Sequence, residues 1–472
     1  MTNIQLVKTD FPDTSFFGNF FVAHALAKNP QKNLSTLIAA HPPKYNTSNA
    51  SEMWKRQSQE QGFTLEFANY MAGVDDDRTG NSLKKILDKT LKETNTKPVV
   101  DFHYPERSML RRQGVQKEIH DTYKDDITQV AHLHCMRDII APDINTIPEG
   151  KSTAWLRKRT ERLLEFYEKG IIKKYITVSP EVKESFLPIL PAESMSVVSN
   201  GINEETYHFR KEEDKESFRR QFSKNKHIDP QRLTIGYSGR LEDCKGYETL
   251  TDVIQWFDKN KEYNTEFLIA TSGGNRFNQF YNDLTKKAPR MLEEDRVGIV
   301  LDVAKLVGKT KHFDAQVETF FQEHVRNLQQ EYQQKKGSLE NTNAKLYRGT
   351  SLSTLQSMSD VYIQPSNTEA FGLATLEAIF TGTPVVATRT GGLKTLVSAQ
   401  VGALTDPDQK KELFIEEFAQ NIIEQFNKNY GQTGDKNTAE FRQEARNRLL
   451  PKYSEKRMKQ ETEDLYAQAR TL

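Results

Sequence analysis

The stretch over residues 365–392, PSNTEAFGLATLEAIFTGTPVVATRTGG, directly follows one strand-like run and contains a second, residues 383–387. Two strands this close, with a helical pattern between them, predict a strand–loop–helix–strand unit. We expect Glu369 in the loop before a helix that starts near Phe371, and Glu377 about two turns inside that helix. A helix N-terminus offers unpaired N–H groups and a positive dipole end to a phosphate. Together, the two carboxylates and the helix end predict a nucleotide-sugar site.

The chain length indicates more than one domain. At 472 residues the chain exceeds one ordinary core and suits two domains of about 200 residues each. Hydrophobic residues make up 36% of the chain but gather in periodic runs, which indicates folding rather than disorder. A net charge of +1 provides no overall case for nucleic-acid binding.

Cysteine use and the distribution of apolar residues predict a soluble, cytoplasmic protein. Cys135 and Cys244 fall in different predicted domains, so we expect no disulfide. The N-terminal residues MTNIQLVKTDFPD lack the basic and apolar regions of a signal peptide. No apolar run approaches the ~20 residues that a membrane-crossing helix needs.

The first half of the chain alternates strand-like and helix-like runs. Strands are expected at residues 4–7, 34–40, 98–103, 127–133 and 175–179. This alternation is typical of a parallel sheet with helices on both faces, whose ligands bind beyond the carboxyl ends of the strands. Gly18, followed by Asn19, precedes a predicted helix over residues 21–28, where glycine permits close backbone approach and the helix N-terminus favours an anion; the alternative is an ordinary turn.

A highly charged stretch, residues 204–231, interrupts the strand rhythm and marks the predicted domain boundary. We assign residues 1–205 to a first domain and 206–452 to a second. The second domain repeats the α/β pattern, with strands expected at residues 233–240, 266–270, 345–348 and 360–364. A polar helix over residues 453–472, with Leu465 and Tyr466 on its apolar side, ends the chain.

Residues 275–344 exceed the short connection that a compact α/β unit uses. Residues 302–336 within them are rich in Gln, Glu, Lys and Phe and favour helix. We interpret 275–344 as an inserted helical arm, for which packing or contact with a protein partner is the expected role.

Two cations follow the strand predicted at residues 233–240. Arg240 and Lys245 occur in the sequence Gly-Arg-Leu-Glu-Asp-Cys-Lys-Gly, beyond the carboxyl end of that strand. An arginine fork and a mobile lysine charge suit a diphosphate. The alternative is a solvated loop, in which both residue types are common.

Histidines follow two strands of the first domain. His132 and His134 alternate onto the same face, so periodicity alone does not separate them. His103, at the end of an earlier strand, is a second candidate that could line an acceptor site. Residues 75–77, three aspartates, could hold a metal ion, but they follow no strand end and are expected to form a solvated turn.

Residues 151–174 carry eight basic and three acidic side chains. Leu156, Leu163 and Tyr167 fall at helical spacing, with Ile171 following. Such a helix could bind a membrane surface, as in an enzyme that uses a lipid acceptor. We favour the alternative, a helix packed on the core with a solvated basic face.

The pattern P-S-x-x-E-x-F-G-L-x-x-x-E-A, followed by G-x-P-V-V-A-x-x-x-G-G, resembles the family-4-type retaining glycosyltransferases, the glycosyl transferases group 1. The order of the Arg…Lys-Gly element before it, and the turn at Asn200-Gly201, are also similar to that family. Lys394 and Thr395 depart from it, since the family commonly has Pro and Glu there. The resemblance implies an α/β GT-B fold: two Rossmann-like domains that face each other across a cleft, with the C-terminal helix packing back on the first.

The resemblance also implies roles for site residues. Glu369 would hold sugar hydroxyls and Glu377 the nucleotide ribose. Arg240 and Lys245 would bind the leaving diphosphate, and His134 would lie near the reacting carbon of the sugar. The remaining contacts to the donor would come from Gly18, Phe371, Gly372 and Leu373.

The activity implied is that of a metal-independent hexosyltransferase that moves a sugar, most simply from a UDP-sugar, to a saccharide, lipid-linked or small-molecule acceptor with retained configuration. Its setting would be bacterial glycan, glycolipid or glycoconjugate synthesis, in the cytoplasm or at the inner membrane face. No cofactor is expected beyond the nucleotide-sugar co-substrate. The alternatives are a catalytically weak subunit that binds or activates a partner, and a nucleotide-sugar epimerase or a phosphorylase on the same fold.

Overall fold

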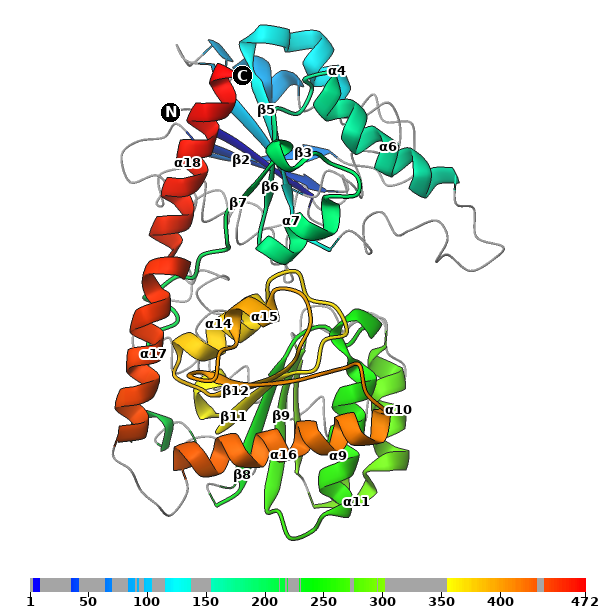
Figure 1. The fold of residues 1–472 in the computed structure, drawn as a ribbon, viewed down its shortest axis with the longest axis vertical. Coiled ribbons are helices and arrows are strands. Elements are labelled where there is room, and N and C mark those ends of the chain that lie inside the picture. The colour runs from blue at the N-terminus through cyan, green and yellow to red at the C-terminus, as the bar shows by residue number, and fades with distance from the viewer. Residues whose placement is uncertain are drawn as a thin grey trace. The chain divides into compact units, whose positions relative to one another are not determined.

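Two parallel sheets, each in its own compact unit, organise the chain (Figure 1). One unit comprises Met1–Gly201 with Lys452–Leu472, and the other comprises Ile202–Pro451. The computed structural model describes residues 3–8, 35–41, 64–69, 84–89, 91–92, 97–103, 115–136, 154–211, 213–216, 219, 229, 231–271, 276–294, 296–301, 355–430 and 437–472. Among these residues, no helix is long and apolar enough to cross a bilayer.

The first unit contains a seven-stranded parallel sheet in the order β3-β2-β1-β4-β5-β6-β7. Its strands are β1 (Asn3–Lys8), β2 (Ser35–His41), β3 (Thr64–Asn69), β4 (Val99–His103), β5 (Thr128–Leu133), β6 (Lys174–Thr177) and β7 (Met195–Val197). The five strands expected from the sequence are confirmed. The two edge strands were not expected from the sequence, because β3 follows a polar run in the chain and β7 has only three residues. β4 and β5 are completely buried, as the central strands of a parallel sheet should be.

Among the described residues, the helices of the first unit are α4 (Val115–Tyr123), α6 (Ala154–Glu168), α7 (Pro180–Phe186) and α18 (Glu455–Thr471), with 3₁₀ turns η3 (Lys124–Asp126) and η5 (Ala192–Ser194). α6 lies in the basic stretch, and its Leu163 and Phe166 are buried. The Tyr175 hydroxyl on β6 donates to the Leu163 carbonyl at 2.8 Å. One side of this helix therefore packs on the core, which favours the core-packed alternative for residues 151–174.

The C-terminal helix α18 belongs to the first unit. Ser454 caps it by accepting from the Arg457 amide, and Pro451 lies in the preceding helix α17 (Asn437–Tyr453). Tyr466 is buried and its hydroxyl donates to Asp101 on β4. A residue near the end of the chain thus contacts a central strand of the sheet.

The second unit contains a six-stranded parallel sheet in the order β10-β9-β8-β11-β12-β13. Its strands are β8 (Leu233–Ser238), β9 (Thr265–Thr271), β10 (Val297–Leu301), β11 (Val361–Gln364), β12 (Val385–Thr388) and β13 (Gly402–Thr405). Strands expected at 233–240, 266–270, 360–364 and 383–387 are confirmed. The strand expected at 345–348 and the helices expected at 21–28 and 302–336 lie outside the described residues.

In the part of the second unit that the structure describes, the helices are α9 (Tyr247–Lys259), α10 (Phe277–Lys287), α11 (Pro289–Glu293), α14 (Leu373–Phe380), α15 (Leu393–Leu396), α16 (Lys411–Tyr430) and most of α17, with the 3₁₀ turn η6 (Asp243–Lys245). One continuous apolar core joins side chains of β8, β9, α9, α10 and α16. Ile235, Phe257, Phe280 and Phe418 are completely buried in it. α9, α10 and α16 therefore each contribute one apolar face to this core.

The expectation that residues 275–344 form an inserted arm is wrong for its first part. α10 and α11 pack in the core through Phe280, Leu284 and Met291, which are completely buried. β10 then pairs parallel with β9 at the sheet edge. Residues 276–301 are therefore part of the α/β unit itself, and the remainder of the predicted arm lies outside the described residues.

Candidate active site

The topology of the second sheet selects one edge for ligand binding. The chain runs from β8 outward through β9 and β10 on one side, and from β11 outward through β12 and β13 on the other. β8 and β11 are parallel neighbours, so the loops at their carboxyl ends lie together at the point where the strand order reverses. This is where open α/β sheets bind ligands. These loops carry Arg240, Lys245 and Glu369.

Backbone contacts fasten the two loops to each other. Gly246 has φ +68°, and a Cβ built on it would lie 1.7 Å from the Pro365 carbonyl oxygen. The Thr368 amide donates to the Cys244 carbonyl at 3.1 Å, and the Asn367 amide side chain donates to Asp243 O at 2.7 Å. Glycine is required here because the position combines a left-handed conformation with close backbone approach. The contacts hold the η6 turn beside the loop that carries Glu369.

Lys245 and Glu369 meet at this junction. The Lys245 Nζ lies 2.6 Å from Glu369 Oε2, and the two side chains are 25% and 11% exposed. Burial opposes the ammonium charge, but the Glu369 carboxylate outweighs burial, so the pKa of Lys245 is raised above its usual value. The Lys245 ammonium is therefore charged at neutral pH, and both side chains keep some exposure to solvent.

A series of hydrogen bonds between buried polar side chains leads to the Glu369 carboxylate. Ser366 donates to Glu369 Oε2 at 3.4 Å, and Gln364 donates to Ser366 Oγ at 2.8 Å. The Tyr362 hydroxyl donates to Gln364 Oε1 at 3.0 Å and lies 2.9 Å from Ser238 Oγ. These side chains come from β8, β11 and the loop that follows β11. A buried network of this kind limits the rotamers available to the carboxylate.

Arg240 lies on the same edge and is more exposed. Its Nη1 lies 2.7 Å from Glu242 Oε1, and its side chain is 37% exposed. The charge of Arg240 acts to lower the pKa of Lys245, so the two cations lie close enough to influence each other. The predicted pair of cations is thus gathered at one sheet edge, where an anion would relieve their repulsion.

The start of α14 adjoins Glu369. Gly372 is its N-cap residue, with φ +96°, and Phe371 before it is buried. The predicted Gly-Gly turn packs against Glu369, because the Gly392 amide donates to the Glu369 carbonyl at 2.9 Å. A Cβ on Gly391 would lie 1.7 Å from the same oxygen. The turn therefore fixes the backbone that carries the carboxylate.

Glu377 lies on α14, as expected. It is about one turn inside rather than two, because the helix begins at Leu373, two residues after Phe371. Gln356 donates to Glu377 Oε2 at 3.4 Å and to the Ala374 carbonyl at 3.1 Å. Burial raises the pKa of the Tyr362 hydroxyl, and the Glu377 and Glu369 carboxylates add to that effect. Both carboxylates therefore act on one buried tyrosine.

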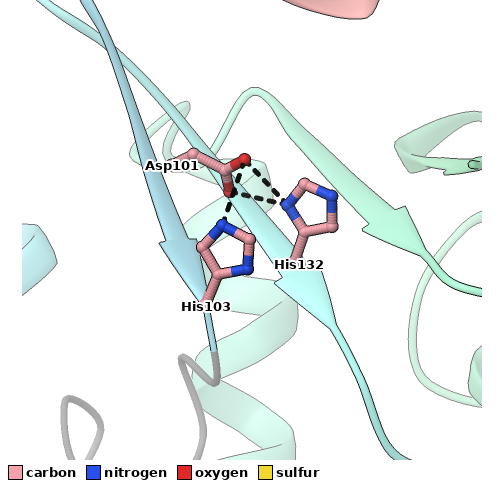
Figure 2. Close-up of side chains that lie close together, drawn as sticks. All are labelled: Asp101, His103 and His132. Atoms are coloured by element: carbon pink, nitrogen blue, oxygen red, sulfur yellow. Dashed lines mark hydrogen bonds and ion pairs between the residues drawn. The ribbon is translucent and has the colours of Figure 1, made fainter. Parts of the chain in front are cut away.

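The first unit brings its candidate histidines together. His103 ends β4 and His134 follows β5, and His103 Nδ1 lies 2.8 Å from His134 Nε2. His132 bonds Asp101 through Nδ1 at 2.8 Å, so His132 and His134 have different partners. Figure 2 shows the Asp101 carboxylate beside the His103 and His132 rings, with an interaction to each. In the described part of the chain, these three residues are the one group whose side chains could hold a metal ion.

Asp101, which lies with these histidines, was not singled out from the sequence. Its signal was available, because Asp101 and His103 alternate on one strand just as His132 and His134 alternate along the next strand. Gly18 and residues 75–77 lie outside the described residues.

Sequence comparison places a family match over the second unit. Residues 288–447 match the family model described as "Glycosyl transferases group 1". A D-inositol 3-phosphate glycosyltransferase from Corynebacterium urealyticum is 50% identical over 56 residues, which is 12% of this chain and 13% of that protein. The chain therefore matches only a small part of the length of this curated relative.

Comparison with solved structures covers the whole chain. HepE from Anabaena, in complex with UDP, matches with a TM-score of 0.63 and 16% identity, covering 99% of this chain and 100% of that one. Sucrose-phosphate synthase from Thermosynechococcus elongatus matches with a TM-score of 0.61 and 16% identity, covering 99% of each chain. The two Rossmann-like units thus have the GT-B fold.

Proposed function

We propose that the chain transfers a sugar from a nucleoside diphosphate to an acceptor hydroxyl, with retained anomeric configuration. The match of residues 288–447 to the glycosyl transferases group 1 model and the GT-B fold support this proposal. The observation that carries this proposal is the Lys245–Glu369 ion pair at the strand-order reversal, with Arg240 on the same edge. UDP is the proposed leaving group, in line with the UDP held by HepE.

The two cations have a direct use in this reaction. The departing diphosphate develops negative charge in the transition state, and fixed positive groups stabilise it there. Arg240 supplies a planar fork of donors and Lys245 a compact charge. The α14 N-terminus, next to Gly372, adds unpaired backbone N–H groups. We therefore propose that the diphosphate is bound without a metal ion.

Glu369 would orient the sugar rather than attack it. Its carboxylate is held by Lys245 and Ser366, which leaves it well suited to accept hydrogen bonds from sugar hydroxyls. Glu377, further along α14, would accept from the ribose hydroxyls. Phe371, Gly372 and Leu373 would present backbone to the sugar and phosphates. Retention would then follow from a front-face displacement in which the leaving diphosphate helps to deprotonate the acceptor.

His134 and Gly18 are proposed contacts from the first unit. The His134 ring is almost completely buried at the carboxyl end of β5. Burial, together with the neighbouring histidines, holds the pKa of His134 well below its usual value, so the ring is neutral at pH 7. A neutral imidazole can donate from one nitrogen and accept at the other, which suits a sugar hydroxyl.

A donor panel tests this function. UDP-, GDP- and ADP-sugars would be incubated with the purified chain, and release of the nucleoside diphosphate measured with and without EDTA. We expect one UDP-sugar to be hydrolysed slowly, to the same extent in EDTA, and the anomeric proton coupling of the released sugar or product to match that of the donor. Inversion at the anomeric carbon would contradict retention. Isomerised donor, a requirement for inorganic phosphate, or no hydrolysis of any donor would favour an epimerase, a phosphorylase or a binding subunit.

A further inference from the structure

The proposed reaction leaves the buried group around Asp101 without a role. Asp101 is completely buried on β4, and the Tyr466 hydroxyl and His132 Nδ1 both donate to its carboxylate. A buried carboxylate needs such donors, since an unpaired one would be strongly destabilising. Tyr466 comes from α18, so the C-terminal helix helps to hold the carboxylate in place.

The three imidazole rings form a stack beside this carboxylate. The ring centroids of His103 and His132 are 4.5 Å apart, and those of His103 and His134 are 5.0 Å apart. His103 contacts both Asp101 and His134: its Nε2 lies 3.7 Å from Asp101 Oδ2, and its Nδ1 lies 2.8 Å from His134 Nε2. His103 is therefore the link between the carboxylate and His134.

The Asp101 carboxylate influences which of the two histidines, His103 or His134, donates the hydrogen bond between them. Burial lowers the pKa of His103, and the neighbouring His132 lowers it further. The pKa therefore lies well below its usual value, and the His103 ring carries one proton. At 3.7 Å the carboxylate is beyond hydrogen-bond distance, but it still favours an N–H over a lone pair on the facing Nε2. His103 Nδ1 then holds a lone pair, and His134 must donate to it from Nε2. The His134 lone pair lies on Nδ1.

A metal ion is the alternative occupant of the group. His132 Nδ1 lies 2.8 Å from each carboxylate oxygen of Asp101, whereas two ligands of one tetrahedral zinc ion are separated by more than about 3 Å. The His103 and His132 rings are also stacked, with 8° between their planes. Direct hydrogen bonds account for this geometry better than a shared ion.

We propose that Asp101 is a positioning residue, which acts through His103 to fix His134 as the tautomer that donates from Nε2 and accepts at Nδ1, and that turnover depends on this tautomer. The second half of this inference rests on the proposed function, in which His134 lies at the sugar. The first half concerns the first unit alone. Tautomer control by a buried carboxylate is a common way to prepare a histidine for substrate.

Nitrogen NMR on the full chain, labelled with ¹⁵N only at histidine, tests the tautomer directly. The His134 signals are identified by their loss in His134→Gln. We expect wild-type His134 to carry its proton on Nε2, and Asp101→Asn to shift the population toward Nδ1–H, because an amide removes the charge that sets the direction. His132→Gln is the matched control: it also removes a partner of Asp101, but it is not part of the link, so the His134 tautomer should stay unchanged.

Kinetics separate this proposal from the proposed function. Asp101→Asn should lower kcat about tenfold or more while KM for the donor changes less than about twofold, since the residue orients rather than binds. Tyr466→Phe leaves the carboxylate charged and should produce a smaller change, which keeps the test usable if Asp101→Asn folds poorly. If Asp101→Asn shifts the His134 tautomer but the wild-type chain hydrolyses no donor, the tautomer control by Asp101 is supported and the proposed glycosyl transfer is contradicted. An unshifted His134 tautomer in Asp101→Asn, or a stoichiometric divalent metal in the purified chain, would overturn the link.

Discussion

The Lys245 ammonium lies 2.6 Å from the Glu369 carboxylate, and this ion pair connects two segments that are 124 residues apart in the chain. Lys245 follows β8 and Glu369 follows β11, so the pair lies where the strand order of the sheet reverses. Each charge compensates the other before a ligand arrives. Removing either partner leaves a partly buried charge without its counter-ion, which makes single substitutions here informative.

Lys245→Met should lower kcat/KM for the UDP-sugar about a hundredfold, which corresponds to roughly 3 kcal/mol of transition-state stabilisation. Methionine keeps much of the apolar stem and removes the charge that would meet the diphosphate. Steady-state release of UDP measures the effect. Lys287→Met is the matched control, because Lys287 forms a 2.8 Å ion pair with Asp252 away from the two site loops and should leave turnover unchanged. Near-normal turnover in Lys245→Met would contradict the proposal that Lys245 binds the leaving diphosphate.

Glu369→Gln should lower kcat while the thermal midpoint stays within a few degrees of wild type. Glutamine preserves the size of the side chain and can still accept from Ser366, but it no longer carries the charge that pairs with Lys245 and that would hold sugar hydroxyls in the proposed function. We expect a loss of about tenfold to a hundredfold in turnover. Glu444→Gln, at an exposed pair with Arg448, is the control for removal of a surface carboxylate. Wild-type activity in Glu369→Gln would mean that this residue does not contact the donor.

The candidate donor site could be predicted because its residues lie in short continuous segments. The apolar runs of β8, β11 and β12 are clear strand signals, and parallel strands place the following loops at one edge. β10 was missed because its five residues lie next to a long polar stretch that resembled an insertion. Those residues form a strand because they pair with β9. This pairing depends on the tertiary structure and cannot be predicted from the local sequence.

The role of Asp101 could not be predicted for a related reason. Its partner Tyr466 is 365 residues away in the chain, and nothing local to either residue connects them. The arrangement of His132 and His134 could be predicted in part. Alternation placed His132 and His134 on one face, but only their contacts, Asp101 for one and His103 for the other, distinguish them.

Gly246→Ala should destabilise the second unit and reduce donor affinity together. The residue has φ +68°, and a Cβ would lie 1.7 Å from the backbone oxygen of Pro365, so the two site loops would have to separate. Strain of about 1–3 kcal/mol is expected, measured as a lowered thermal midpoint and a weaker Kd for UDP. Gly170→Ala is the matched control: its φ is +65°, but the added Cβ would meet only the mobile end of Lys173. Equal effects of the two substitutions on Kd would show that strain alone, and not the loop junction, is responsible.

Glu266→Gln should flatten the pH dependence of stability between about pH 4.5 and 7. Burial raises the pKa of Glu266 on β9 from 4.5 to about 7, despite donation from Thr234 and the Asp229 amide. The folded state therefore binds more protons than the unfolded state in this window, so the free energy of unfolding falls as pH rises and levels off above pH 7. The loss amounts to roughly 3 kcal/mol, which the neutral glutamine avoids. Urea unfolding of wild type and variant from pH 5 to 8 measures the difference, and the exposed Glu262→Gln is the control. Parallel wild-type and Glu266→Gln curves would mean that Glu266 titrates near its ordinary pKa in the folded protein.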